Sequence, residues 1–175
     1  MKKLEQLMLD RWNSGEFSQV AKEACQSPDA IAELFELNKH ENPKVAWRSA
    51  YVIDMVHDLY PQMVMPYLEF IATTVPKVQN HSIKRHYLRI LAQHDLSELA
   101  DGKLVDSCFE WLLIRDIPIA VKAHCMTILF NLTQTYPELA PELKTVLEQL
   151  IPYGSAGEKN RAKKILGQMK KMKLT

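Results

Sequence analysis

Apolar residues recur at helical spacing through most of the chain. One stripe has the spacing i, i+4, i+7, i+8 and i+11, and consists of Val45, Ser49, Val52, Ile53 and Val56. The same stripe returns as Val121, Cys125, Ile128, Leu129 and Leu132. A second helical pattern lies between such stripes: Ile31, Leu34 and Phe35, then Leu68 and Ile71, then Phe109, Leu112 and Leu113, then Val146, Leu147 and Leu150. The pattern predicts two alternating kinds of helix.

The alternation has a fixed period. The segments that begin at Asn42, Asn80 and Pro118 lie 38 residues apart and agree in kind at their apolar positions, and a fourth copy fits if one residue is deleted. Each unit therefore reads as helix, turn, helix, turn. We expect an N-terminal helix pair from Leu4–Trp12 and Phe17–Cys25, and a single domain over 1–175, divided into N-terminal helices (1–27), repeats (28–170) and a tail (171–175).

The repeating unit resembles the HEAT repeats of armadillo-type α-solenoid proteins. Asn42-Pro43-Lys44-Val45 through Ala50, and Asn80-His81-Ser82-Ile83-Lys84-Arg85, carry this resemblance, since they are similar to the start of the family's second helix. The resemblance implies an all-α fold: a right-handed α-α superhelix of about four HEAT-like two-helix repeats plus the N-terminal pair. It also implies that the second helices line the concave surface.

Several candidate binding residues fall on that surface. At 100° per residue, Trp47, Tyr51 and Asp54 lie opposite the core stripe, and would be exposed. The 38-residue equivalence places Arg85 beside Trp47, and Arg89 beside Tyr51. Aromatic and arginine side chains are common anchors at binding surfaces. The alternative is that the two aromatic residues fill the gap between adjacent repeats.

Charge is divided between the helices. The net charge is only +1, from 22 Lys/Arg and 21 Asp/Glu, so the whole chain has no field for polyanions. Residues 80–94, 118–136 and 155–175, however, contain eleven Lys/Arg and one acid, whereas Asp95–Asp116 contains six acids. The division predicts a basic inner face, and an ordinary solvated face is the alternative. Equivalent positions add Arg48, Lys122 and Arg161 to the candidate binding residues.

No catalytic or metal-binding motif is evident. The histidines form no ligand set at helical spacing, and HExxH, CxxC, G-x-S-x-G, Walker and G-x-G-x-x-G motifs do not occur. We therefore predict no catalytic residue, no metal and no cofactor. Three cysteines in apolar runs indicate reduced thiols and a cytoplasmic location. The weakly charged stretch 63–75 contains Pro66 and Glu69, so no membrane span is expected.

These features predict a non-enzymatic protein-binding or scaffolding module that uses its concave face, with an acidic protein segment as the expected partner. The alternative is a nucleic-acid-binding protein. The HEAT-like bacterial alkylpurine DNA glycosylases use aromatic residues, a carboxylate and arginines, which is the chemical make-up of the candidate residues here. This chain is shorter than those enzymes, and no residue-by-residue match to them exists. A purely structural subunit of a larger assembly is a further alternative.

Overall fold

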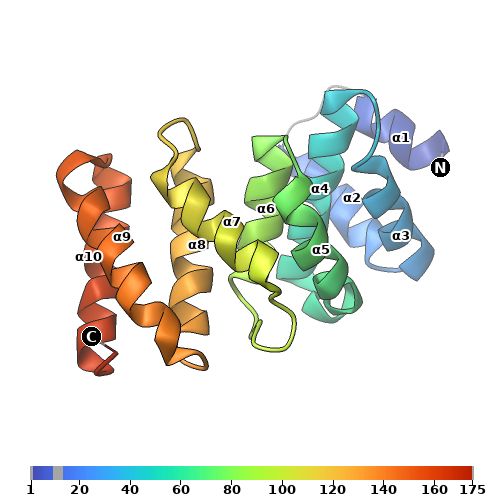
Figure 1. Cartoon of the computed structure of the whole chain (residues 1–175). Helices are drawn as coiled ribbons and strands as arrows, with labels where there is room; N and C mark the ends of the chain where they lie inside the picture. Colours follow the sequence, from blue (N-terminus) through green and yellow to red (C-terminus); the bar gives the residue numbers. More distant parts are fainter. Residues whose placement is uncertain (1, 10–13, 175) are drawn as a thin grey trace.

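The computed structural model describes residues 2–9 and 14–174, which form α-helices and short 3-10 helices, with no strand in these ranges (Figure 1). The α-helices are α1 (Lys2–Leu9), α2 (Ser14–Ala24), α3 (Pro28–Leu37), α4 (Pro43–Leu59), α5 (Leu68–Thr74), α6 (His81–Leu91), α7 (Gly102–Leu113), α8 (Ile119–Leu132), α9 (Ala140–Tyr153) and α10 (Ala156–Lys171). The 3-10 helices are η1 (Pro61–Met63), η2 (Met65–Tyr67), η3 (Val75–Lys77) and η4 (Pro137–Leu139).

The helices confirm the predicted α-solenoid. Four pairs, α3/α4, α5/α6, α7/α8 and α9/α10, follow one another along one axis (Figure 1), and α1 and α2 precede them as the predicted N-terminal pair. Trp12, the predicted end of the first helix, lies outside the described residues.

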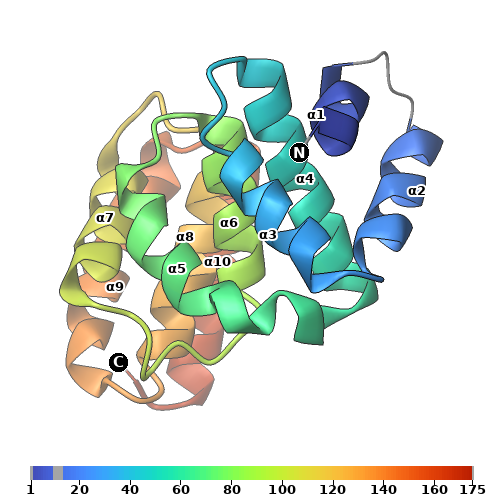
Figure 2. The same ribbon diagram turned by 90° about the vertical axis from the view of Figure 1, so that its right-hand side faces the viewer.

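The second helices form the inner row of the stack. Helix α4 packs on α6, α6 on α8 and α8 on α10, whereas the first helices α5, α7 and α9 contact one another less closely. Figure 2 looks along the stack, so that later pairs lie behind earlier ones. Closer packing on one side curves the row toward that side, so we call the surface formed by α4, α6, α8 and α10 the inner face.

Side-chain caps explain where several helices begin. The side-chain oxygen of Asn42 accepts a hydrogen bond from the Lys44 amide, and that of Asn80 accepts from the Ser82 amide. These bonds satisfy helix N–H groups that have no partner within the helix. In the third copy Pro118 takes the same place without a side-chain cap. The repeated asparagine is therefore a structural feature of the unit, not a sign of a binding site.

The predicted stripes form the core. Every member of the first stripe is fully buried or nearly so, and the equivalent residues of α8 are buried with it. Ser49 satisfies its buried hydroxyl by donating to the Ala46 carbonyl, and it accepts from the Asn38 side-chain amide at 3.1 Å. Among the described residues, no helix has both the length and the apolar character needed to cross a membrane.

Candidate functional site

The two rows of helices differ sharply in charge. The second helices α4, α6, α8 and α10 carry twelve Lys/Arg and three Asp/Glu, whereas the first helices α3, α5, α7 and α9 carry two Lys/Arg and eight Asp/Glu. The three acids of the second helices are Asp54, Asp58 and Glu158. Each of them forms an ion pair with a basic residue of a neighbouring second helix. The net charge that the inner row presents to a ligand therefore depends on which of its basic residues these ion pairs neutralise.

Asp54 is the centre of a buried network between α4 and α6. One of its oxygens lies 2.5 Å from Arg89 Nη1, and the other accepts from His86 Nδ1 at 2.8 Å. Arg89 also contacts Asp58 at 3.0 Å, and the bonds to Asp58 and Asp54 outweigh burial and raise the Arg89 pKa. The prediction that Asp54 is exposed is wrong, because α6 covers it and leaves only 3% of the residue accessible.

The network reaches the surface through Arg85. This exposed residue places Nη2 2.9 Å from His86 Nε2. Arginine can only donate, so His86 Nε2 is the acceptor and the proton of the neutral ring lies on Nδ1, facing Asp54. His86 therefore links an exposed guanidinium to a buried carboxylate.

Trp47 and Tyr51 lie on the same face of α4 as Asp54 and pack against Phe17 of α2. The Phe17 ring centroid is 6.2 Å from that of Trp47 and 4.8 Å from that of Tyr51. Tyr51 also lies 5.1 Å from the His86 ring, rather than meeting Arg89. Both residues are half-buried, so they are less exposed than one prediction had them, and part of each ring fills space against the N-terminal helix α2, close to the alternative of a gap-filling role. Helix α2 covers part of each of them and leaves the rest on the inner face.

Arg48 lies beside the same aromatic pair. Its Nη1 donates to the Met8 carbonyl at 2.6 Å, and its guanidinium lies 5.7 Å from the Trp47 ring centroid. The side chain is half-buried. Arg48 therefore attaches α1 to α4 as well as adding charge near Trp47.

Lys122 does not lie on the inner face. It is buried, and its Nζ forms an ion pair with Glu158 at 2.9 Å. The equivalent Lys84 is buried as well, with its Nζ 3.9 Å from the Trp111 ring centroid. The prediction of Lys122 as an accessible binding residue is wrong, because this position of the unit points between helices.

Arg161 lies at the contact between the second helices α10 and α8, which we call a seam between second helices. Its Nη2 donates to the Thr127 hydroxyl, and the residue is half-buried. The equivalent His124 faces the seam from α8. Burial lowers the pKa of His124 to about 4; Asp54 opposes this shift, whereas Arg89, Arg161 and Arg85 add to it. His124 is therefore neutral at pH 7.

Two histidines that the sequence analysis did not connect face each other near one end of the inner face. His57 Nε2 of α4 lies 2.7 Å from His94 Nε2, in the turn after α6. The separation of 37 residues is close to the period of 38, so the rule that places equivalent residues of adjacent units side by side could have brought the pair together.

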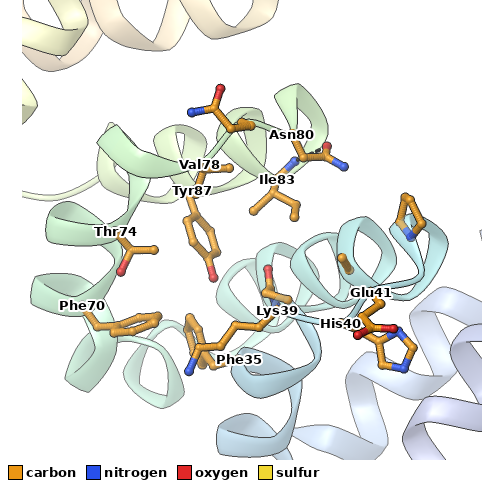
Figure 3. Close-up of a pocket in the computed structure, with 14 residues that line it drawn as sticks. Phe35, Lys39, His40, Glu41, Phe70, Thr74, Val78, Asn80, Ile83 and Tyr87 are labelled. Atoms are coloured by element: carbon orange, nitrogen blue, oxygen red, sulfur yellow. Dashed lines mark hydrogen bonds between the residues drawn. The ribbon is translucent and has the colours of Figure 1, made fainter.

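The structure also forms a pocket of about 350 Å³ between α3, α5 and the start of α6. Figure 3 shows Tyr87 directing its hydroxyl toward the space bounded by Phe35, Phe70 and Lys39. The Phe35 and Phe70 rings meet edge to face with their centroids 5.6 Å apart, and Lys39 Nζ lies 6.0 Å from the Phe70 ring centroid. Sequence patterns did not indicate this pocket, because its rings come from three separate helices.

Comparisons with known proteins agree with this fold. A chain of the complex of CpcE and CpcF of phycocyanin lyase from Nostoc sp. PCC7120 superimposes with a TM-score of 0.60 at 12% identity, over 94% of this chain and 98% of that chain. At this identity the likeness concerns the fold alone. A crystal structure of an engineered protein matches with a TM-score of 0.47 at 14% identity, over 98% of both chains. No curated protein sequence matches the chain.

The family model of the HEAT repeat domain matches residues 4–169, which includes the N-terminal pair and all four two-helix units. This match agrees with the 38-residue period and with the antiparallel pairs of the structure. The chain belongs to the HEAT repeat family.

Proposed function

We propose that the protein is a non-enzymatic protein-binding module whose inner face receives an acidic segment of a partner. One observation carries the proposal: every acid of the second helices is already paired within the molecule. Exposed Arg85 and Lys164, in contrast, have no carboxylate partner among the described residues. A ligand therefore meets a net positive surface although the chain is nearly neutral.

Small residues on α8 separate α6 from α10, the helices that carry Arg85 and Lys164. On α8, the positions equivalent to Arg85 and Arg89 are Ala123 and Thr127, both half-buried. An extended segment can approach the α8 backbone there while Arg85 and Lys164 contact its carboxylates from α6 and α10. Arginine binds a carboxylate with two parallel hydrogen bonds, which adds direction to the attraction.

The aromatic pair provides an apolar end to this surface. Trp47 and Tyr51 are half-buried against Phe17, which fixes their orientation while part of each ring stays accessible. Rigid aromatic side chains bury a large area with little loss of conformational entropy. We therefore propose that an apolar residue of the partner packs on this pair, next to the basic region.

Nucleic acid is the second candidate ligand, because Arg85, Lys164 and the aromatic pair also suit a phosphate backbone with an unstacked base. Catalysis of the glycosylase kind is not part of the proposal. Asp54, its candidate carboxylate, is buried and bonded to Arg89 and His86, and therefore does not face a ligand.

A fluorescence-anisotropy titration separates the two ligands. The probes are a labelled peptide that alternates Glu with Leu and Phe, a labelled DNA duplex and an uncharged peptide, each at about 50 mM and about 200 mM salt. We expect the acidic peptide to bind best, and to weaken as salt rises. Preference for the duplex would favour the nucleic-acid alternative, and equal binding of the uncharged peptide would contradict both.

Matched variants locate the binding surface. Arg85→Ala with Lys164→Ala removes two charges from the inner row, and Lys103→Ala with Lys144→Ala removes two from the outer row. We expect only the inner-row variant to lose affinity for the acidic peptide. Equal loss in both variants would show nonspecific attraction, and unchanged affinity in the inner-row variant would contradict the proposed face.

A further inference from the structure

The pocket between α3, α5 and the start of α6 has an aromatic wall that other rings hold in place (Figure 3). The Phe35 ring stacks on Tyr67 with their centroids 4.4 Å apart, and its centroid lies 6.3 Å from that of Tyr87. Together with the edge-to-face contact to Phe70, these neighbours fix the orientation of Phe35. The volume of about 350 Å³ is near the lower end of the range for small-molecule sites, about 300–1,000 Å³. The pocket therefore suits a compound of one or two rings.

Tyr87 brings a polar group into this apolar space. Only 1% of the residue is accessible, and Figure 3 shows its hydroxyl directed into the pocket, toward Phe35 and Lys39. Burial raises the pKa of Tyr87, so the hydroxyl keeps its proton and can donate. Within residues 2–9 and 14–174, no other group forms a hydrogen bond with it. Because buried polar groups normally have a partner, this hydroxyl is suited to bind a ligand.

A second residue of the pocket, Asn38, has an unpaired acceptor. Its side-chain nitrogen lies 2.6 Å from the Leu34 carbonyl oxygen and 3.1 Å from Ser49 Oγ. A carbonyl oxygen only accepts, so the amide nitrogen must face Leu34, which fixes the orientation of the group. The amide oxygen is buried and has no hydrogen-bond partner in the described part of the chain. A ligand that donates to this oxygen would satisfy it.

The charged residues at the edge of the pocket leave little net charge for a ligand. Lys39 Nζ pairs with Glu36 at 2.8 Å, and His40 Nε2 lies 3.2 Å from Glu5 Oε1. Glu41 is exposed, so solvent and salt screen its charge. The pocket therefore favours a neutral ligand over an ion.

We propose that this pocket binds a free, neutral phenol. The aromatic and aliphatic walls bury the ring, the Asn38 oxygen accepts from the phenol hydroxyl, and the Tyr87 hydroxyl donates to the phenol oxygen. A hydroxyl both donates and accepts, whereas a ring N–H such as that of indole only donates, so a hydroxyl answers both unpaired groups. The site lies outside the inner face and does not depend on the binding of an acidic segment.

The test measures binding to the full chain by fluorine NMR. The probes are para-fluorophenol and para-fluorotoluene, which differ only in a hydroxyl and a methyl group. We expect saturable binding of para-fluorophenol and about two- to tenfold weaker binding of para-fluorotoluene. A tyrosine side chain of a partner has the same chemistry, so N-acetyltyrosinamide is added as a competitor. Displacement by N-acetyltyrosinamide as efficient as by phenol would overturn the assignment to a free compound.

Two matched variants locate the site. Tyr87→Phe removes the buried hydroxyl and keeps the ring, and Tyr153→Phe makes the same change at a residue that is 92% exposed. We expect Tyr87→Phe to weaken para-fluorophenol about two- to tenfold and to leave para-fluorotoluene unchanged, which also shows that the pocket remains folded. Tyr153→Phe should change neither. No saturable binding of para-fluorophenol, equal binding of the two probes, or full binding of para-fluorophenol by Tyr87→Phe would overturn the proposal.

Discussion

Two junctions between second helices each bury a carboxylate, but they use it differently. Between α4 and α6, Asp54 binds Arg89 and His86, and His86 continues to exposed Arg85. Between α8 and α10, Glu158 pairs with buried Lys122 and also accepts from the Ser155 amide and hydroxyl. The first acid organises the residues of the proposed binding surface, whereas the second fixes the start of the terminal helix. Burial of a carboxylate therefore does not by itself define its role.

The largest expected effect comes from Asp54→Asn. It leaves Arg89 and His86 without their shared carboxylate, and loss of one partner of a buried charge pair costs about 3–5 kcal/mol. Urea unfolding measures the free energy of unfolding of each variant. Asp58→Asn is the control, because this exposed acid contributes about 1 kcal/mol or less. Equal losses in the two variants would show that Asp54 is not the centre of the first junction.

Glu158→Gln should cost about 3 kcal/mol, since it strands the Lys122 ammonium and weakens the Ser155 capping box. Adding Lys122→Met removes the stranded charge, so the double variant should recover part of the loss. The measurement is again urea unfolding, taken as a double-mutant cycle. If the double variant is less stable than Glu158→Gln, the buried lysine is not the source of the cost.

A pH series tests the burial of His124, which lies on α8 between these two junctions. His124 has a pKa of about 4 in the folded chain against an ordinary value of 6.5. The unfolded chain thus binds the proton first, and stability falls as pH drops from about 6.5 toward about 4, by about 2–3 kcal/mol for this group. His57 and His94 act in the same direction. The difference between the native chain and His124→Asn, measured by denaturation at each pH, isolates His124. A difference independent of pH would contradict its neutral, buried state.

The smallest expected effect on stability comes from Arg85→Ala. Arg85 is exposed, and within residues 2–9 and 14–174 its one hydrogen-bond partner is the His86 ring, so its loss should change the unfolding free energy by about 0.5 kcal/mol or less. The same variant should weaken binding of the acidic peptide and flatten its salt dependence. A large loss of stability would show that Arg85 belongs to the structural network rather than to the surface.

The helices and their order follow from the sequence because the apolar spacing repeats, and the core buries the apolar residues that have this spacing. Asp54 was misplaced because a helical wheel treats one helix alone, whereas α6 covers the flank of α4 where Asp54 lies. Lys122 was misplaced for a related reason. Aligning the lysines of successive repeats shows that they occupy equivalent positions, but it does not show which neighbouring helix each side chain faces. The pairing of His57 with His94 was within reach of the sequence, because their separation of 37 residues is close to the period of 38, but the equivalence rule was applied only to the arginines and lysines.

Hydrogen exchange with and without the acidic peptide tests the location of binding most directly. We expect slower exchange in α6 and α10, in segments that contain Arg85 and Lys164, with little change in α5 and α9. Protection confined to the first helices, or to the segments that form the pocket in Figure 3, would contradict a binding surface on the inner face.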